Sequence, residues 1–140
     1  MSILRRRRGT AIVETDKGIL VTAGRSKIFI TPGGGAGRRE SRMQASIREL
    51  KEETGLEPYF AMALFKFEGK VHQTYNFQDL HTVYLIKAQG TAEPKHEVKY
   101  VAYYKPGCDL RLSSTTKKII DEYLLYKEKN KEIFDIIDRL

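Results

Sequence analysis

Three glutamates, Glu49, Glu52 and Glu53, stand close together within the stretch Gly33–Leu56. On a helix, residues three and four apart share a face, with their β-carbons about 5–6 Å apart. Carboxylates at that spacing repel one another, whereas a hard cation such as Mg²⁺ prefers carboxylate oxygens and is often completed by substrate phosphates. The spacing alone is more typical of a solvated acidic helix face, and a metal site is the alternative for which the surrounding residues must argue.

The surrounding residues predict the helix that this spacing requires. A helix is predicted from roughly Ser41 to Thr54, because an apolar stripe with helical spacing lies along it at Met43, Ile47, Leu50 and Thr54. Glu40 or Ser41 can cap its start, and Gly55 stands where a left-handed residue ends a helix. The glycines ahead of the helix let the backbone approach a metal or a phosphate closely, and free N–H groups at a helix start favour anions.

Nine residues of this stretch fit the pattern G-x5-E-x7-R-E-U-x-E-E-x-G-U, in which U is a bulky aliphatic residue. They are Gly34, Glu40, Arg48, Glu49, Leu50, Glu52, Glu53, Gly55 and Leu56. The pattern resembles the signature of the Nudix hydrolase family. The resemblance implies an α/β fold, in which a mixed β-sheet is sandwiched between helices and the box forms a loop-helix-loop. It also implies Mg²⁺-dependent hydrolysis of a phosphoanhydride bond, with Mn²⁺ as a substitute.

The resemblance further implies roles for individual residues. Metal ligands are expected at Gly34, Glu49, Glu52 and Glu53. Glu49 is a further ligand or orients the attacking water. Glu97, just before a predicted strand, matches the distant carboxylate that many members add as a ligand or general base, and Glu93 is the less suitable alternative.

Other residues near the glutamates are expected to support the loop or the phosphates. Glu40 and Arg48 match a salt bridge that braces the loop, with phosphate binding by Arg48 as the alternative. Structural or phosphate-binding roles are also assigned to Gly33, Gly35, Arg38 and Arg39. The histidines His72, His81 and His96 lack metal-ligand spacing and are interpreted as strand or loop residues, with contact to a base as the alternative.

The family signature does not specify the substrate, so other residues must indicate its class. A MutT-like pyrophosphohydrolase acting on a nucleoside triphosphate is the leading interpretation. Diadenosine polyphosphates are an alternative because Tyr75 stands near the tyrosine position of such enzymes. Diphosphoinositol polyphosphates and RNA 5′ ends are further alternatives, since arginine runs and a net charge of +7 suit polyanions. Val71 and His72 occupy the place where enzymes for ADP-ribose tend to carry proline, which lowers the weight of that substrate.

The rest of the chain predicts the scaffold. Short strands are expected over 9–15, 19–23, 27–31, 59–69, 71–77, 81–89 and 98–104, with a turn at 76–79. Helices are expected from about 114 to 140, with a break at Asn130. We expect a single domain over 1–140, in the cytoplasm and without membrane contact, because the N-terminal apolar run is too short for a signal peptide. The apolar stripe of the tail packs on the sheet or joins a partner, so a homodimer is plausible.

Overall fold

The computed structural model describes residues 2–140 of the 140-residue chain. Its elements are β1 (Leu4–Ile12), β2 (Glu14–Thr15), β3 (Gly18–Ala23), β4 (Gly33–Gly35), α1 (Arg42–Thr54), β5 (Glu57–His72), β6 (Phe77–Gln89), β7 (Tyr100–Tyr104), α2 (Ser114–Lys129) and α3 (Lys131–Ile137). The predicted mixed α/β architecture is confirmed. None of the described helices combines the length and the apolar character needed to cross a membrane.

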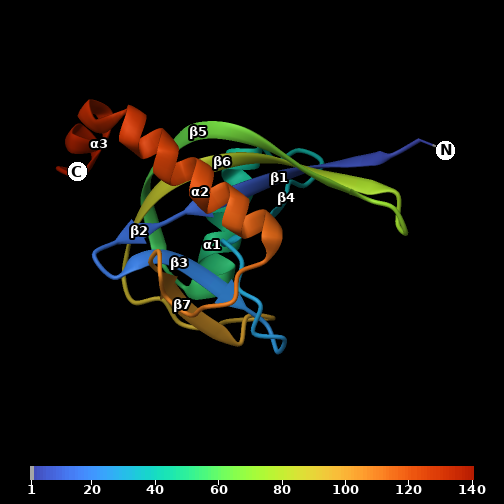
Figure 1. The fold of residues 1–140 in the computed structure, drawn as a ribbon, viewed down its shortest axis with the longest axis horizontal. Helices are drawn as coiled ribbons and strands as arrows, with labels where there is room; N and C mark the ends of the chain where they lie inside the picture. Colours follow the sequence, from blue (N-terminus) through green and yellow to red (C-terminus); the bar gives the residue numbers. More distant parts are fainter. Residues whose placement is uncertain (1) are drawn as a thin grey trace.

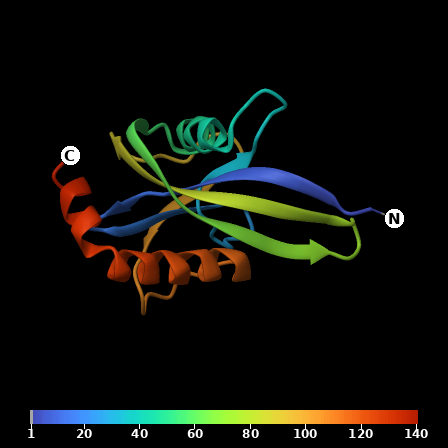
Figure 2. The same cartoon turned by 90° about the horizontal axis from the view of Figure 1, so that it is seen from above.

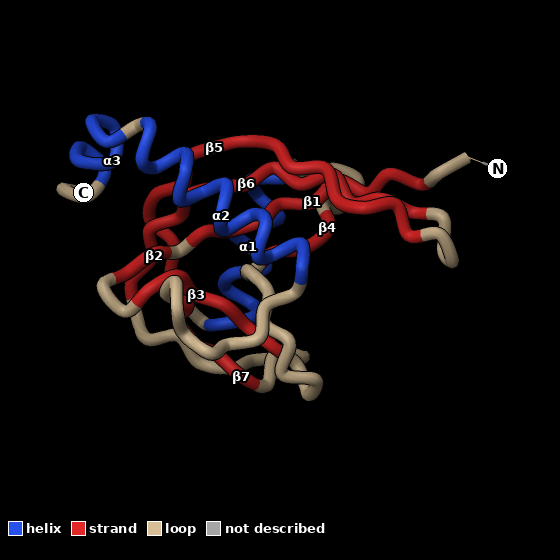
Figure 3. The backbone as a smooth tube through the Cα atoms, viewed as in Figure 1, coloured by secondary structure: helices blue, strands red, loops and turns tan. Residues whose placement is uncertain are grey.

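Two sheets organise the chain. The larger has the strand order β4-β1-β6-β5, with β1 parallel to β6 and the other pairs antiparallel. The smaller is antiparallel with the order β2-β3-β7. Figures 1 and 2 show α1 on one face of the larger sheet and α2 on the other. In Figure 3, β5, β6 and the start of β1 project beyond the helices toward the N-terminus.

Side chains along the central strands point alternately to the two faces of the larger sheet, so each face carries a hydrophobic core. On β1, Ala11 packs with Leu50 of α1, whereas the neighbouring Ile12 packs with Ile120 of α2. The same alternation on β6 sends Tyr84 and Ile86 to the α1 side, and Val83 and Leu85 to the α2 side. Successive strand residues point to opposite faces, so one strand serves two layers.

The contact between α1 and β1 is unusually close at one point. A Cβ atom at Gly9 would overlap the backbone carbonyl oxygen of Arg42, at the start of the helix. Only glycine permits this approach of backbone to backbone. The helix therefore begins directly over Gly9 of β1, which lies two residues before the buried Ala11.

Three strand predictions need correction. Residues 27–31 do not form a strand: Ile30 and Phe29 make only isolated bridges, to Thr22 and Leu112. The glycines expected to stop that strand form β4 instead, because ladder pairing uses backbone groups and needs no side chain. The strand expected over 59–69 continues to His72 as β5, with an irregularity between Glu68 and Val71. The strand expected over 71–77 does not form, because residues 73–76 are the turn, which was expected at 76–79, and Phe77 begins β6.

The tail is helical as predicted, and α2 ends at Lys129, directly before Asn130. Phe134 and Ile137 of α3 are buried in the core on the α2 side of the sheet. Ile136 and Leu140 remain 63% and 59% exposed. The stripe thus packs on the sheet in part, and a homodimer through the exposed part stays a prediction.

Candidate active site

The helix α1 that carries the glutamates has well-formed ends. The Ser41 side chain accepts a hydrogen bond from the Gln44 N–H at 3.0 Å, and the Gln44 side chain accepts one from the Ser41 N–H at 2.8 Å. At the other end, Gly55 adopts the left-handed conformation, with φ 75° and its N–H bonded to the Lys51 carbonyl. This reciprocal capping box and glycine terminus fix the register of the helix.

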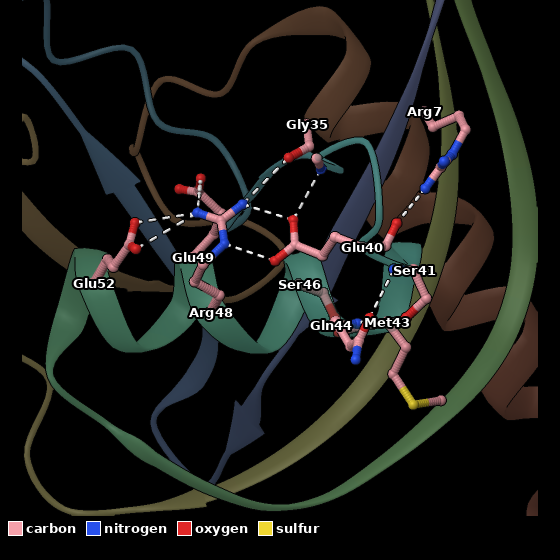
Figure 4. A network of polar contacts seen from close by, with 11 residues as sticks. Arg7, Gly35, Glu40, Ser41, Met43, Gln44, Ser46, Arg48, Glu49 and Glu52 are labelled. Atoms are coloured by element: carbon pink, nitrogen blue, oxygen red, sulfur yellow. Dashed lines mark hydrogen bonds and ion pairs between the residues drawn. The ribbon is translucent and has the colours of Figure 1, made fainter.

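Arg48 is the centre of a polar network on α1 (Figure 4). Its Nε and Nη2 donate to the two carboxylate oxygens of Glu40 at 2.7 and 2.9 Å. Its Nη1 donates to Glu49 at 2.9 Å and lies 3.3 Å from a Glu52 oxygen. A further contact, from Nη2 to the Gly35 carbonyl at 3.3 Å, ties the helix to β4. The predicted Glu40–Arg48 bridge is therefore formed, and the same guanidinium also compensates two of the clustered glutamates.

Glu40 is held at the loop end of this network. It also accepts a hydrogen bond from the Gly37 N–H at 2.9 Å. The hydrogen bonds from Arg48 and then from Gly37 lower the pKa of Glu40 to about 2. Arg7 donates to the backbone carbonyl of the same residue. The loop between β4 and α1 is thereby attached to both the helix and β1.

The remaining glutamates of the cluster lie against the glycines of β4. The Gly33 N–H donates to Oε1 of Glu53 at 3.1 Å. A Cβ atom at Gly34 would lie only 2.6–2.7 Å from Cδ, Cγ and Oε1 of Glu49. Glycine is thus required at Gly34 by space, because the carboxylate of Glu49 occupies the volume of a side chain. The predicted proximity of the glycines to the glutamates is observed.

Glu53 has the most perturbed acidity of the cluster. Its burial raises its pKa from 4.5 to about 7, the Gly33 hydrogen bond opposes this, and the charges of Glu49 and Glu97 raise it further. Arg8 lowers it through its positive charge. A buried carboxylate with a raised pKa among other carboxylates is an arrangement that a bound cation would stabilise.

The donor set fits a hard divalent cation in its chemistry. Glu49, Glu52 and Glu53 supply carboxylate oxygens on one helix, and β4 supplies backbone carbonyls beside them, which are the ligand types that Mg²⁺ prefers. Within residues 2–140, however, no three His, Cys, Asp or Glu side chains are already arranged as a ligand set. Arg48 instead shares the oxygens of Glu49 and Glu52. A metal bound to those two glutamates would replace Arg48 as their partner.

Glu97 is brought to the cluster from a loop distant in sequence. The loop runs beside the end of α1, where Glu93 N–H donates to the Thr54 carbonyl at 2.9 Å and Lys95 N–H to the Glu53 carbonyl at 3.1 Å. Glu97 lies close enough to Glu53 for its charge to raise the pKa of that residue. The role of Glu97, in preference to Glu93, stays a prediction.

Three other predicted residues are exposed. Arg38 and Arg39 are exposed on the loop between β4 and α1, and Arg39 lies beside Glu40, Arg48 and Glu52. Tyr75 is 76% exposed in the turn between β5 and β6. The structure therefore does not bring Tyr75 to the glutamates.

A cavity of about 520 Å³ opens on the α2 side of the larger sheet. We call it the sheet cavity. Its lining comes from β1, the residues before β4, the β5–β6 hairpin and the start of α2, and includes Arg8, Thr10, Thr31, Val71, His81 and Thr115. Its size is typical of pockets for small ligands.

Arg8 connects this cavity to the glutamates. It lines the sheet cavity and its charge acts on Glu53. Its Nε is buried and has no hydrogen-bond partner among residues 2–140, and its Nη1 lies 4.0 Å from Asp79. Sequence reasoning missed this residue, because within the run Arg5–Arg8 nothing but strand alternation distinguishes it. Arg8 therefore offers donors to an anion in the cavity.

Comparison with known proteins agrees with the geometry. The NUDIX domain model matches residues 4–116. A Nudix hydrolase family member from Chromobacterium violaceum has 35% sequence identity, a TM-score of 0.77, and coverage of 97% of this chain and 92% of its own. The E. coli ORF135 protein shares the fold at 20% identity and TM-score 0.75, with 91% and 94% covered.

A MutT Nudix hydrolase from Burkholderia pseudomallei also shares the fold. It has 20% identity and a TM-score of 0.70, with 84% of this chain and 96% of that one covered. No curated protein matches significantly.

Proposed function

This chain belongs to the Nudix hydrolase family, and from that premise we propose that it hydrolyses a phosphoanhydride bond in a nucleoside diphosphate linked to a further group, foremost a nucleoside triphosphate. Nudix hydrolases generally use a divalent metal, and Mg²⁺, or Mn²⁺ in its place, is the metal we propose. The observation that carries the proposal is the cluster of glutamates on α1 against the glycines of β4. Arg8, whose positive charge acts on Glu53, lines a cavity large enough for a nucleoside.

We assign a role in the proposed reaction to each residue of the site. Glu49, Glu52 and Glu53, with a carbonyl of Gly34, hold the metal, which when bound neutralises phosphate charge and polarises the phosphorus. Glu97 orients the attacking water and accepts its proton. Arg8 holds the phosphate nearest the nucleoside, because it lines the cavity and its Nε has no partner among the described residues. Water adds to phosphorus, the bridging P–O bond breaks, and a nucleoside monophosphate and pyrophosphate result.

The experiment that tests this proposal is a product assay on a panel of substrates with Mg²⁺. The panel holds nucleoside triphosphates, diadenosine polyphosphates, ADP-ribose, diphosphoinositol polyphosphates and 5′-triphosphorylated RNA. When the reaction is carried out in H₂¹⁸O, mass spectrometry of the products shows which phosphorus the water attacks. We expect pyrophosphate and a nucleoside monophosphate from one nucleoside triphosphate, with the ¹⁸O label in one of these two products. Turnover of only non-nucleotide substrates would overturn the proposal.

Hydrolysis of RNA 5′ ends is a second candidate because of one surface feature. Arg5, Arg6 and Arg7 are exposed on the end of β1 that projects from the domain (Figure 3). Contacts of this kind to an RNA backbone weaken steeply with salt. RNA turnover that falls steeply between low and physiological salt, while turnover of free nucleotides does not, would favour this candidate.

A further inference from the structure

The sheet cavity contains one side chain that is nearly buried yet keeps a free hydrogen-bonding atom. His81, on β6, is 8% exposed and lines the cavity. Its Nδ1 lies 2.8 Å from the Thr10 hydroxyl, and its ring meets that of Phe67 edge to face, with centroids 5.9 Å apart. Within residues 2–140, Nε2 has no hydrogen-bond partner. The imidazole is therefore fixed by two neighbours, and only Nε2 is available to a ligand.

The approach to Nε2 is left open by a glycine. A Cβ atom at Gly69, on the neighbouring strand β5, would lie 3.8 Å from Nε2. Any longer side chain at that position would stand between this atom and the cavity, which Gly69 also lines. The backbone there permits a ligand atom to reach the imidazole.

The hydrogen bond with Thr10 indicates which nitrogen of the His81 ring carries the proton. Thr10 is 2% exposed, and its hydroxyl has Nδ1 of His81 as its only partner among the described residues. A buried hydroxyl proton without an acceptor is costly, so the hydroxyl donates to Nδ1. Burial and the charge of Arg8 lower the pKa of His81 to about 4, so the ring is neutral and carries one proton. That proton is then on Nε2, which is a donor.

We propose that His81 determines substrate specificity by donating a hydrogen bond from Nε2 to an acceptor on the nucleobase, a carbonyl oxygen or a ring nitrogen. This inference rests on the proposed function and deepens it. A neutral donor suits a neutral acceptor, whereas the phosphates are met by Arg8, which lines the same cavity and acts on Glu53. The cavity thus holds the base at His81 and the phosphate chain at Arg8.

The test compares base discrimination in four variants. His81→Phe keeps a ring against Phe67 but removes the donor, and His81→Gln keeps an N–H near the Nε2 position. Thr10→Val removes the hydroxyl that fixes the tautomer, and Thr22→Val is its control, because Thr22 is equally buried but does not line the cavity. For each, kcat/KM is measured on nucleoside triphosphates with different bases, together with the melting temperature.

We expect His81→Phe to lower kcat/KM for the preferred base by about tenfold, the worth of one hydrogen bond in such a site, and mainly through KM. Poorer substrates should change little, His81→Gln should recover part of the loss, and Thr22→Val should match the wild type. A uniform change across bases, or no change, would overturn the inference and leave the proposed function standing.

Base analogues keep the test decisive if a variant does not fold. Wild-type protein is assayed with the preferred triphosphate and with analogues that each lack one acceptor of the base, such as a ring nitrogen replaced by carbon. One analogue should lose about tenfold in kcat/KM. If none loses activity, the inference is overturned. If the wild type hydrolyses no nucleotide at all, the proposed function fails and the inference fails with it.

Discussion

The Gly33 N–H donates a hydrogen bond across 3.1 Å to Oε1 of Glu53, which joins the edge strand β4 to the end of α1. The same two elements meet again where Gly34 lies against Glu49. The glycines and the glutamates of the box are therefore parts of one structure, in which the strand supplies backbone donors and space, and the helix supplies carboxylates.

Replacing Glu53 by glutamine should abolish most turnover and preserve the fold. Glutamine keeps an oxygen that can accept the Gly33 hydrogen bond but removes the negative charge proposed to hold the metal. We expect kcat to fall by about 10²-fold or more, with an unchanged far-UV CD spectrum. Glu132→Gln, an exposed residue of α3, is the control. Normal turnover in a folded Glu53→Gln protein would contradict the proposed role.

Replacing Gly34 by alanine should reduce activity more than stability. The new Cβ would stand 2.6–2.7 Å from atoms of Glu49 and would displace its side chain. Gly37→Ala is a matched control from the same loop, because a Cβ there lies 3.7 Å from its nearest neighbours. Steady-state rates and melting temperatures of both variants test this prediction. Equal rates for the two variants would show that the position of Glu49 is unimportant for activity.

Magnesium should raise the melting temperature of the protein. A ligand that binds only the folded state stabilises it by about 2.7 kcal/mol at a concentration 100 times its dissociation constant. Differential scanning fluorimetry with a Mg²⁺ titration measures the shift, and EDTA should reverse it. The Glu53→Gln variant should show a much smaller shift. An equal shift in wild type and variant would place the metal elsewhere.

Acid should destabilise the protein through His81. The pKa of this residue is lowered from 6.5 to about 4 by burial and by Arg8, with Asp79 opposing. Between these values the unfolded state binds a proton that the folded state does not, so the free energy of unfolding falls as the pH is lowered, by about 3 kcal/mol at most. Urea unfolding between pH 7 and 4 measures it. His81→Phe should lack this contribution, and parallel curves would contradict the prediction.

Tyr75→Ala should leave turnover of nucleoside triphosphates unchanged. Its ring is 76% exposed in the hairpin turn, and it does not line the sheet cavity. Rates on triphosphates and on diadenosine polyphosphates should both match the wild type. A selective loss on the dinucleotides would instead support the role suggested by its position in the sequence.

The sequence predicted best what depends on local spacing. The helix Ser41–Thr54 follows from its stripe and its caps, and the Glu40–Arg48 bridge from the family signature. The strand expected over 27–31 failed because apolar β-branched residues pack equally well without a ladder, and Ile30 and Phe29 pair only singly. The hairpin turn was misplaced by a few residues, at a point where Asn76 adopts φ 57°.

The sheet cavity lay beyond sequence reasoning because its parts are distant in the chain. His81 and Thr10 are separated by 71 positions and meet only because β1 pairs in parallel with β6. In the sequence, His81 is one of three histidines without distinctive spacing. Alternation within a predicted strand could have placed His81 and Val83 on one face, but not the partner strand opposite them.

The alternation along β1 also bears on how such an enzyme diversifies. Gly9 and Ala11 face α1 and anchor the helix that carries the glutamates, whereas Arg8 and Thr10 face the sheet cavity. Residues that anchor the helix with the glutamates and residues that line the cavity are thereby mounted on opposite faces of one strand. Mutations can accumulate on the cavity side without loosening the helix, so new substrate preferences can evolve while the chemistry is inherited intact.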